Sequence, residues 1–262
     1  SKFKKTGDQQ RMAGNTKVKT ILVTQPKPET EKNPYFDLAK KFNVKIDFRP
    51  FIQIEGIPAK DFRKDRVNVA EFQAVILTSR QAADHYFRLA AEMRFTTFDD
   101  IKFFCVSEST AFYLQKYITY RKRKVFYGNN SINDLTDVLK KHKKERFLLP
   151  CSEVMNPDIA DTLKESDINF VPAAMYRTVS SDLSDLNIEL FDMIVFFSPS
   201  GVQSLMKNFP KYKQGNTRIA TFGATTAQTA KDSKLKVEVM APVPEAPSMT
   251  MAIEQYLKKA NK

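Results

Sequence analysis

Hydrophobic and polar positions alternate in blocks along the chain from residue 19 onward. Short apolar runs rich in β-branched and aromatic residues are followed by stretches of about ten residues with the amphipathic spacing of a helix. This alternation is typical of βαβ units and predicts parallel sheets. Ten strands are expected, five in each of two sheets, at residues 19–24, 44–49, 72–78, 101–105, 124–127, 146–150, 168–172, 191–197, 218–222 and 236–240.

The chain also repeats itself weakly, with repeats that begin near residues 19 and 146. The matching segments are 74–79 with 194–201, and 104–111 with 220–227. A duplicated pattern implies two equivalent halves. Two connectors in matching places, residues 51–56 and 173–177, are extended in pattern and are expected to form paired hinge strands. These residues leave open whether each repeat folds on itself or the repeats exchange their first two strands.

Composition places the chain among compact globular proteins that attract anions. Hydrophobic residues make up 42% of the chain, and 42 Lys and Arg against 30 Asp and Glu leave a net charge of +12. Such a charge attracts anions without identifying them. Residues 1–17 are predicted to be a mobile basic arm. A nucleic-acid binder is the least favoured hypothesis, because no motif combines aromatic and basic residues in the way that stacks bases.

Membrane, export and metal signals are absent from the sequence. The longest apolar run, residues 193–197, is far shorter than the ~20 residues of a membrane helix, and no apolar segment follows the basic start as in a signal peptide. Cys105 and Cys151 show neither disulfide nor zinc-ligand spacing, so no metal is expected. We therefore expect a cytoplasmic protein with no nucleic-acid or membrane partner.

Small polar residues stand where predicted strands give way to helices. These helix starts are at Ser79, at Ser107, at Ser198 with Pro199, and at Gly223 with Thr225 and Thr226. In open α/β sheets, ligands bind outside the carboxyl ends of the strands, where helix N-termini attract anions. Any one of these hydroxyls is expected to cap its helix rather than to bind a ligand. Their repetition at matching positions favours an anion-binding cleft, and no nucleotide-binding glycine motif occurs.

Few residues are suited to acid–base catalysis. His85 falls in an amphipathic helix pattern and His142 in a basic run, so Ser-His-Asp catalysis and a histidine-bound metal are weak hypotheses. Tyr176 stands in a connector beside an arginine, where its phenol can reach a cleft. By position alone, interdomain packing is favoured over catalysis for this tyrosine. Arg80 and Lys207 are candidate anion contacts because they lie near the turns, although a solvated role is favoured for each.

At these residues the chain resembles the uroporphyrinogen-III synthase family. The most specific segments are 196–202 (FFSPSGV) and 219–227 (IATFGATTA). Residues 21–26 resemble the opening strand of the family, and residues 76–79 resemble its middle turn. The hinge tyrosine of the family matches Tyr176. The resemblance spans nearly the whole chain from residue 19 onward.

Two residues of the first half depart from the family pattern. Gln25 stands where many members carry an arginine, and Ser107 replaces an expected glycine. The departures bear on substrate contacts from the first half, whereas the second-half motifs are intact. We expect substrate binding by Thr24, Ser79, Arg80, Ser107, Ser198, Ser200, Gly201, Gly223, Thr225 and Thr226.

The resemblance implies two flavodoxin-like parallel-sheet α/β domains joined by a two-stranded hinge, with a chain that crosses over and returns. Residues 1–50 and 178–262 would form the first domain, and residues 57–172 the second. Residues 51–56 and 173–177 would be the hinge connectors.

The resemblance also implies a cyclising hydro-lyase without a cofactor. Its substrate is hydroxymethylbilane, a linear polycarboxylate tetrapyrrole, which loses its hydroxyl and closes through a spiro intermediate. The product is uroporphyrinogen III, with ring D inverted, formed in the interdomain cleft. Tyr176 would assist departure of the hydroxyl, and a cleft lined by helix N-termini would hold the carboxylates. We expect a monomer that contacts the preceding pathway enzyme transiently.

The alternative is a non-catalytic two-domain protein that closes about a hinge on a tetrapyrrole or another polyanionic ligand. Such a protein would bind the bilane or its product without accelerating formation of the type III isomer. Analysis of the product isomers separates the two hypotheses.

Overall fold

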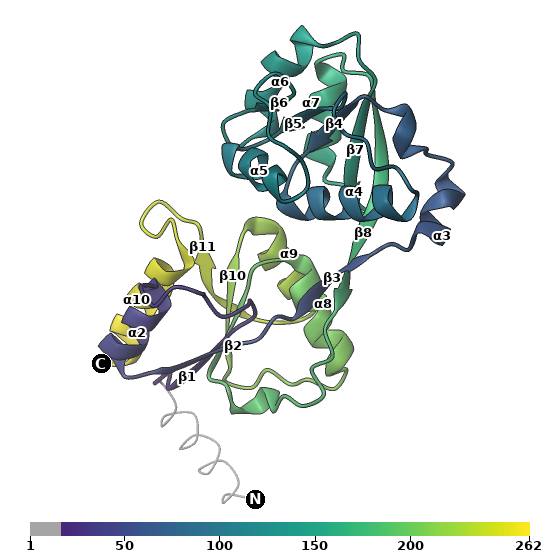
Figure 1. The fold of residues 1–262 in the computed structure, drawn as a ribbon. Coiled ribbons are helices and arrows are strands. Elements are labelled where there is room, and N and C mark those ends of the chain that lie inside the picture. The colour runs from purple at the N-terminus through teal and green to yellow at the C-terminus, as the bar shows by residue number, and fades with distance from the viewer. Residues whose placement is uncertain (1–16) are drawn as a thin grey trace, which may run out of the picture. The chain divides into compact units, whose positions relative to one another are not determined.

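The structure is a computed structural model that describes residues 17–262. The predicted basic arm, residues 1–17, lies outside the described residues except for its last position. Two compact units make up the chain (Figure 1). Unit 1 comprises Ser1–Gln53 and Val179–Lys262, and unit 2 comprises Ile54–Thr178. The chain thus leaves unit 1, forms unit 2 and returns to unit 1.

Unit 1 contains a five-stranded parallel sheet. Its strands are β1 (Thr20–Val23), β2 (Lys45–Phe48), β9 (Met193–Phe196), β10 (Arg218–Phe222) and β11 (Val237–Ala241). They are arranged in the order β11-β10-β9-β1-β2. Numbered by their appearance within the unit, this is the flavodoxin-like order 2-1-3-4-5, with its switch point between β1 and β9.

Helices cover both faces of the unit 1 sheet. α2 (Pro34–Phe42) and α10 (Met249–Ala260) pack on one face, and α8 (Pro199–Asn208) and α9 (Ala224–Asp232) on the other. The alternation of a strand explains this arrangement, because successive side chains point to opposite faces. In β1, Ile21 and Val23 join the core under α2 and α10, whereas Leu22 joins the core under α8 and α9. Residues Ile188–Leu190 add a short 3₁₀ turn.

The second sheet has six strands rather than the predicted five. They are β3 (Ile52–Gly56), β4 (Ala74–Leu77), β5 (Lys102–Cys105), β6 (Val125–Tyr127), β7 (Phe147–Ser152) and β8 (Phe170–Ser180), in the order β3-β8-β7-β4-β5-β6. The extra strand is the first connector, which hydrogen-bonds alongside β8. β8 continues through the second connector as one strand of 11 residues. The prediction of five strands was wrong because these connectors pair with each other inside a sheet.

Unit 2 is also layered on both faces. α3 (Ala59–Phe62), α4 (Arg80–Glu92) and α5 (Glu108–Tyr113) share one core with the sheet, and α6 (Ile132–Lys141) and α7 (Pro157–Glu165) share the other. Short 3₁₀ turns lie at Arg63–Asp65, Val69–Glu71 and Leu114–Lys116. No helix among residues 17–262 is both long and apolar enough to cross a membrane.

The order of the strands answers the question that the sequence left open. β7 and β8 begin the second repeat, yet they belong to the second sheet, where β7 pairs with β4 and β8 with β7. Likewise β1 and β2 of the first repeat belong to the first sheet, where β1 pairs with β9 and β2 with β1. The repeats therefore exchange their first two strands. All ten predicted strands are present, which confirms the parallel α/β fold.

Candidate active site

Three candidate residues of unit 1 gather at the switch point of its sheet. Ser198 follows β9 and caps α8, because its side chain accepts the Gly201 N–H at 3.1 Å. A methyl group placed on Gly201 would lie 3.5 Å from Ser198 Oγ and 4.0 Å from Thr24 Oγ1. The Thr24 hydroxyl donates to the Val195 carbonyl at 2.7 Å, which fixes the end of β1 against β9. The three residues therefore form one small polar site beside the first turn of α8.

The second turn of unit 1 starts a helix without a side-chain cap. Gly223 adopts a φ of 95°, which strains any other residue, and no side chain accepts the first N–H groups of α9. Thr225 is exposed, and Thr226 is buried with its hydroxyl 3.9 Å from a methyl group placed on Gly223. A helix N-terminus leaves several N–H groups without intrahelical acceptors. The first turn of α9 can therefore donate to an anionic ligand. Ser200 is partly exposed in the corresponding first turn of α8.

In unit 2, Ser79 and Tyr176 lie together although 97 positions separate them in the sequence (176 − 79). Ser79 follows β4 and caps α4 by accepting the Ala82 N–H at 3.0 Å. Tyr176 lies on β8 with 8% of its surface exposed. Burial raises the pKa of Tyr176, and a hydrogen bond with the Ser79 side chain partly opposes that rise. The phenol is therefore protonated at neutral pH and can act as a donor.

His85 packs against Tyr176, a contact that the sequence did not reveal. The two rings stack with centroids 5.2 Å apart and planes inclined by 22°. Burial and the nearby Arg88 lower the pKa of His85, so its imidazole is neutral at pH 7. Arg88 holds the ring by donating to His85 Nδ1 at 3.1 Å, and it donates to the Met175 carbonyl at 2.9 Å. The amphipathic pattern that places His85 in a helix was the one feature of the sequence that bears on this contact, and it does not identify the partner ring.

Two other candidates of unit 2 stand at the starts of α4 and α5. Arg80, at the first position of α4, donates to Ser109 Oγ at 2.6 Å. Ser107 caps α5 by accepting the Thr110 N–H at 3.1 Å. Ser107 therefore satisfies its own helix, whereas Arg80 is exposed and keeps further donors for a ligand. Lys207 is exposed in the last turn of α8, at the end away from the Ser198 turn, which agrees with the solvated role favoured for it.

These residues define two sets of groups, one at the carboxyl edge of each sheet. The unit 1 set offers backbone donors, hydroxyls and close approach at Gly223. The unit 2 set offers an arginine and a buried phenol with a neutral imidazole stacked on it. Within residues 17–262, no group of three or more His, Cys, Asp or Glu side chains is arranged to hold a metal ion. The side chains of the two sets offer anion binding and proton donation.

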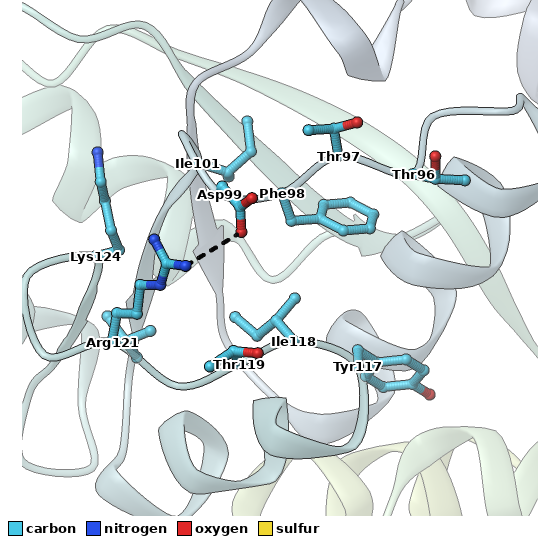
Figure 2. A pocket seen from close by; sticks show the side chains of 11 residues that line it. Thr96, Thr97, Phe98, Asp99, Ile101, Tyr117, Ile118, Thr119, Arg121 and Lys124 are labelled. Atoms are coloured by element: carbon cyan, nitrogen blue, oxygen red, sulfur yellow. Dashed lines mark ion pairs between the residues drawn. The ribbon is translucent and has the colours of Figure 1, made fainter.

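A polar cavity of about 370 Å³ lies at the other edge of the unit 2 sheet. The segments that precede β5 and β6 line it, and Figure 2 shows the Arg121 guanidinium directed at the Asp99 carboxylate, with Lys124 nearby. The closest nitrogen and oxygen of that ion pair are 3.9 Å apart. Ligands of parallel α/β sheets bind at the carboxyl edge instead. This cavity is therefore separate from Ser79 and Tyr176 and does not belong to the candidate site.

Known proteins with a similar sequence pattern or fold point to one family. The family model described as "Uroporphyrinogen-III synthase HemD" matches residues 35–251. A search of curated proteins by sequence finds no match. Among solved structures, a uroporphyrinogen-III synthetase from Helicobacter pylori is similar with a TM-score of 0.59 and 15% identity, covering 92% of this chain and 100% of the other.

A mutant uroporphyrinogen III synthase from Thermus thermophilus is similar with a TM-score of 0.51 and 15% identity, over 92% of this chain and 100% of that one. At this level of identity the two structures support the fold. The family model covers most of the chain, including the Tyr176 strand and the Ser198 and Gly223 turns. The chain belongs to the uroporphyrinogen-III synthase family.

Proposed function

We propose that this protein converts hydroxymethylbilane into uroporphyrinogen III, closing the linear tetrapyrrole with ring D inverted. The observation that carries the proposal is the family match over residues 35–251. The reaction expels water and closes a ring, which places the enzyme among the lyases. The two carboxyl-edge sets supply the donors that such a substrate needs.

The carboxylates of the substrate are the groups that unit 1 is suited to bind. The uncapped first turn of α9 supplies N–H donors and the partial positive charge of a helix N-terminus. Gly223 lets a ligand approach the backbone closely, since a methyl group placed there meets only Thr226 Oγ1 within 4 Å. Hydrogen bonds from backbone N–H groups to an ionised carboxylate are among the stronger ones in proteins. We infer that this set holds carboxylates in a fixed geometry.

Tyr176 is the group that we assign to departure of the hydroxyl. Its raised pKa keeps the phenol protonated, so it can donate to the leaving oxygen as the carbon–oxygen bond breaks. The electron pair of that bond leaves with the oxygen as water, and a pyrrole nitrogen stabilises the cation that remains. The substituted α-carbon of ring D attacks this cation and forms the spiro intermediate, after which the bond from that carbon to the bridge next to ring C breaks. The freed bridge carbon bonds to the other α-carbon of ring D, which then loses its proton and restores the phenol. The balance of the whole reaction is the loss of one water.

Positioning is the other part of the proposed catalysis. The bilane closes by itself without inversion, so the enzyme must hold its ends in a geometry that favours inversion. Preorganised dipoles at helix starts achieve this without reorganisation during the reaction. We further propose that the enzyme works in the cytoplasm without a cofactor, as a monomer that contacts its bilane-supplying enzyme transiently. The two cysteines are unpaired, which suits a reducing compartment.

The direct test is incubation with freshly generated hydroxymethylbilane, followed by separation of the type I and type III products. We expect the type III isomer to predominate, at a rate proportional to the enzyme concentration. Formation of the type I isomer alone would reject the catalytic proposal. Tight binding of the bilane in that case would instead support the non-catalytic alternative.

A further inference from the structure

An aromatic cavity of about 340 Å³ opens at the carboxyl edge of the unit 1 sheet. Its walls include Tyr35, Phe197 and Phe222, and its rim includes Ser248 and Thr250. Phe197 directly follows β9, and Phe222 is the last residue of β10. The cavity therefore adjoins the Ser198 and Gly223 turns, because each phenylalanine immediately precedes one of them in the chain.

The fold places the three aromatic rings on one face of the sheet. All three pack against the core that lies under α2 and α10. The rings of Phe197 and Phe222 have centroids 6.5 Å apart and planes inclined by 34°. Tyr35, in the first turn of α2, contacts Phe48 edge to face with centroids 5.7 Å apart. All three cavity residues remain partly exposed, so their free faces line the cavity.

We propose that this cavity seats one pyrrole ring of the linear substrate, an inference that rests on the proposed function. A volume of about 340 Å³ is at the lower end of the roughly 300–1,000 Å³ range of ligand pockets, so it suits one substituted ring rather than a tetrapyrrole. Aromatic faces prefer offset or edge-to-face contact with another ring, and a pyrrole can make either contact. The occupant is thus a planar ring with acidic side arms.

The surroundings of the cavity suit the acidic arms of such a ring. Burial raises the pKa of Tyr35 to about 12, so its phenol is neutral and can donate to a carboxylate. The Ser248 and Thr250 hydroxyls also line the cavity and hydrogen-bond to each other at 3.2 Å, while Ser248 accepts the Met251 N–H. One of the two O–H groups is used in their mutual bond, so the other is left to donate to a carboxylate. A ring in the cavity also lies next to the first turns of α8 and α9, to which we assign carboxylate binding. One pyrrole ring of the substrate can therefore place its plane in the cavity and its carboxylates at the first turns of α8 and α9.

Anchoring one ring has a consequence for the product. A bilane that dissociates early closes in solution to the type I isomer, so weaker anchoring increases the type I share. The cavity residues thus act in positioning and contribute to isomer specificity. Loss of an aromatic face should affect KM more than kcat, because the ring is bound before and during the reaction.

The test uses Phe197→Leu, Phe222→Leu and the double variant of the full chain. We expect KM for hydroxymethylbilane to rise roughly 2- to 10-fold for each change, the range of one aromatic contact. We also expect the double variant to release a larger share of type I product than the wild type. The matched control is Phe209→Leu, a partly buried phenylalanine against the opposite core of unit 1. The control should retain wild-type KM and isomer ratio.

A binding experiment separates this inference from the proposed function. A monopyrrole with one acetate and one propionate arm is added to each protein, and saturation-transfer NMR measures its binding. Binding that is lost in the double variant and kept in Phe209→Leu supports the cavity, whether or not the wild type makes the type III isomer. Equal binding by all variants, or an unchanged KM and isomer ratio in the double variant, overturns the inference. Wild-type protein that forms only type I product rejects the proposed function alone.

Discussion

After β10 of unit 1 the chain enters α9 through Gly223, whereas after β5 of unit 2 it enters α5 through Ser107. The two residues occupy matching places in the repeats. Ser107 accepts the Thr110 N–H at 3.1 Å, so a side chain already satisfies one of the free donors of α5. Gly223 has no side chain to do this, and the donors of α9 remain for an external acceptor. The difference between serine and glycine at this position thus separates a helix start with a side-chain cap from one without.

The two units also differ in the histidine and tyrosine side chains that they bring to the candidate site. Unit 2 contains both histidines of the chain and the buried Tyr176 phenol, while unit 1 contains no histidine. Unit 1 instead has the aromatic cavity and two glycines at its helix starts. In the proposed function this contrast corresponds to a division of work, in which unit 1 would bind and orient the substrate and unit 2 would supply the proton.

The largest effect is expected from removing the phenol of unit 2. Tyr176→Phe should lower kcat by about 10²-fold, at the low end of general acid contributions, because a protonated donor is lost while the ring still stacks on His85. Steady-state kinetics with hydroxymethylbilane measures this. Tyr117→Phe is the control, since its phenol bonds to Asp84 in the same unit. Full activity in Tyr176→Phe would remove this residue from the mechanism.

The next effect should come from the uncapped turn of unit 1. Gly223 has a φ of 95°, a conformation that is strained for any residue with a side chain. Gly223→Ala should therefore lower the free energy of unfolding by about 1–3 kcal/mol. It should also raise KM, since the new methyl group keeps substrate away from the first turn of α9. Thermal unfolding and KM are measured together.

Gly215→Ala separates strain from binding in that experiment. Gly215 also has a positive φ, of 53°, and a methyl group placed there meets nothing within 4 Å. The Gly215→Ala protein should lose stability without a change in KM. An unchanged KM in Gly223→Ala would contradict the assigned role of the turn in unit 1.

The sequence predicted where the strands lie, but it did not predict which side chains from distant parts of the chain contact each other. Apolar runs such as 193–197 and the small residues after them depend on local pattern, so the strands and helix starts were predictable. The stacking of His85 on Tyr176 joins α4 to β8, and local periodicity carries no information on such a contact. Likewise, the sequence predicts that Phe197 and Phe222 each end a strand, but it does not predict that the two strands are neighbours. The order of strands in the sheet brings both residues to one cavity.

A smaller effect should distinguish the serine caps of the two units. Ser79→Ala and Ser198→Ala each remove a side-chain cap and should each cost about 1 kcal/mol of stability. Only Ser79 also bonds to Tyr176, where it opposes the rise in pKa.

The pH dependence of kcat tests this difference. The donor role needs a protonated phenol, so activity should fall as pH rises through the pKa of Tyr176, above the ordinary tyrosine value of about 10. Ser79→Ala should move this alkaline limb to higher pH, and Ser198→Ala should leave it in place. A limb that moves equally in both variants would show that unit 2 does not hold the titrating group.

The smallest effect concerns stability in mild acid, and it should appear in unit 2 alone. The pKa values of His85 and His142 both lie below the ordinary 6.5, first because burial disfavours the charged imidazole. As pH falls through 6.5, the unfolded chain binds protons before the folded chain does, so the free energy of unfolding decreases. Unit 1 has no histidine, and the lowered pKa values of Asp182, Asp185 and Glu254 affect its stability only below about pH 4.

Hydrogen exchange resolved by peptide, at pH 7.5 and 5.5 with rates corrected for pH, measures the two units in one sample. Protection in the β4 to β8 region should decrease at the lower pH, while β1, β9 and β10 keep theirs. The His85→Gln, His142→Gln double variant should reduce the decrease, because glutamine does not titrate. Equal loss of protection in both sheets would mean that the acid response belongs to the whole chain, and the contrast in titratable groups would then have no consequence for stability.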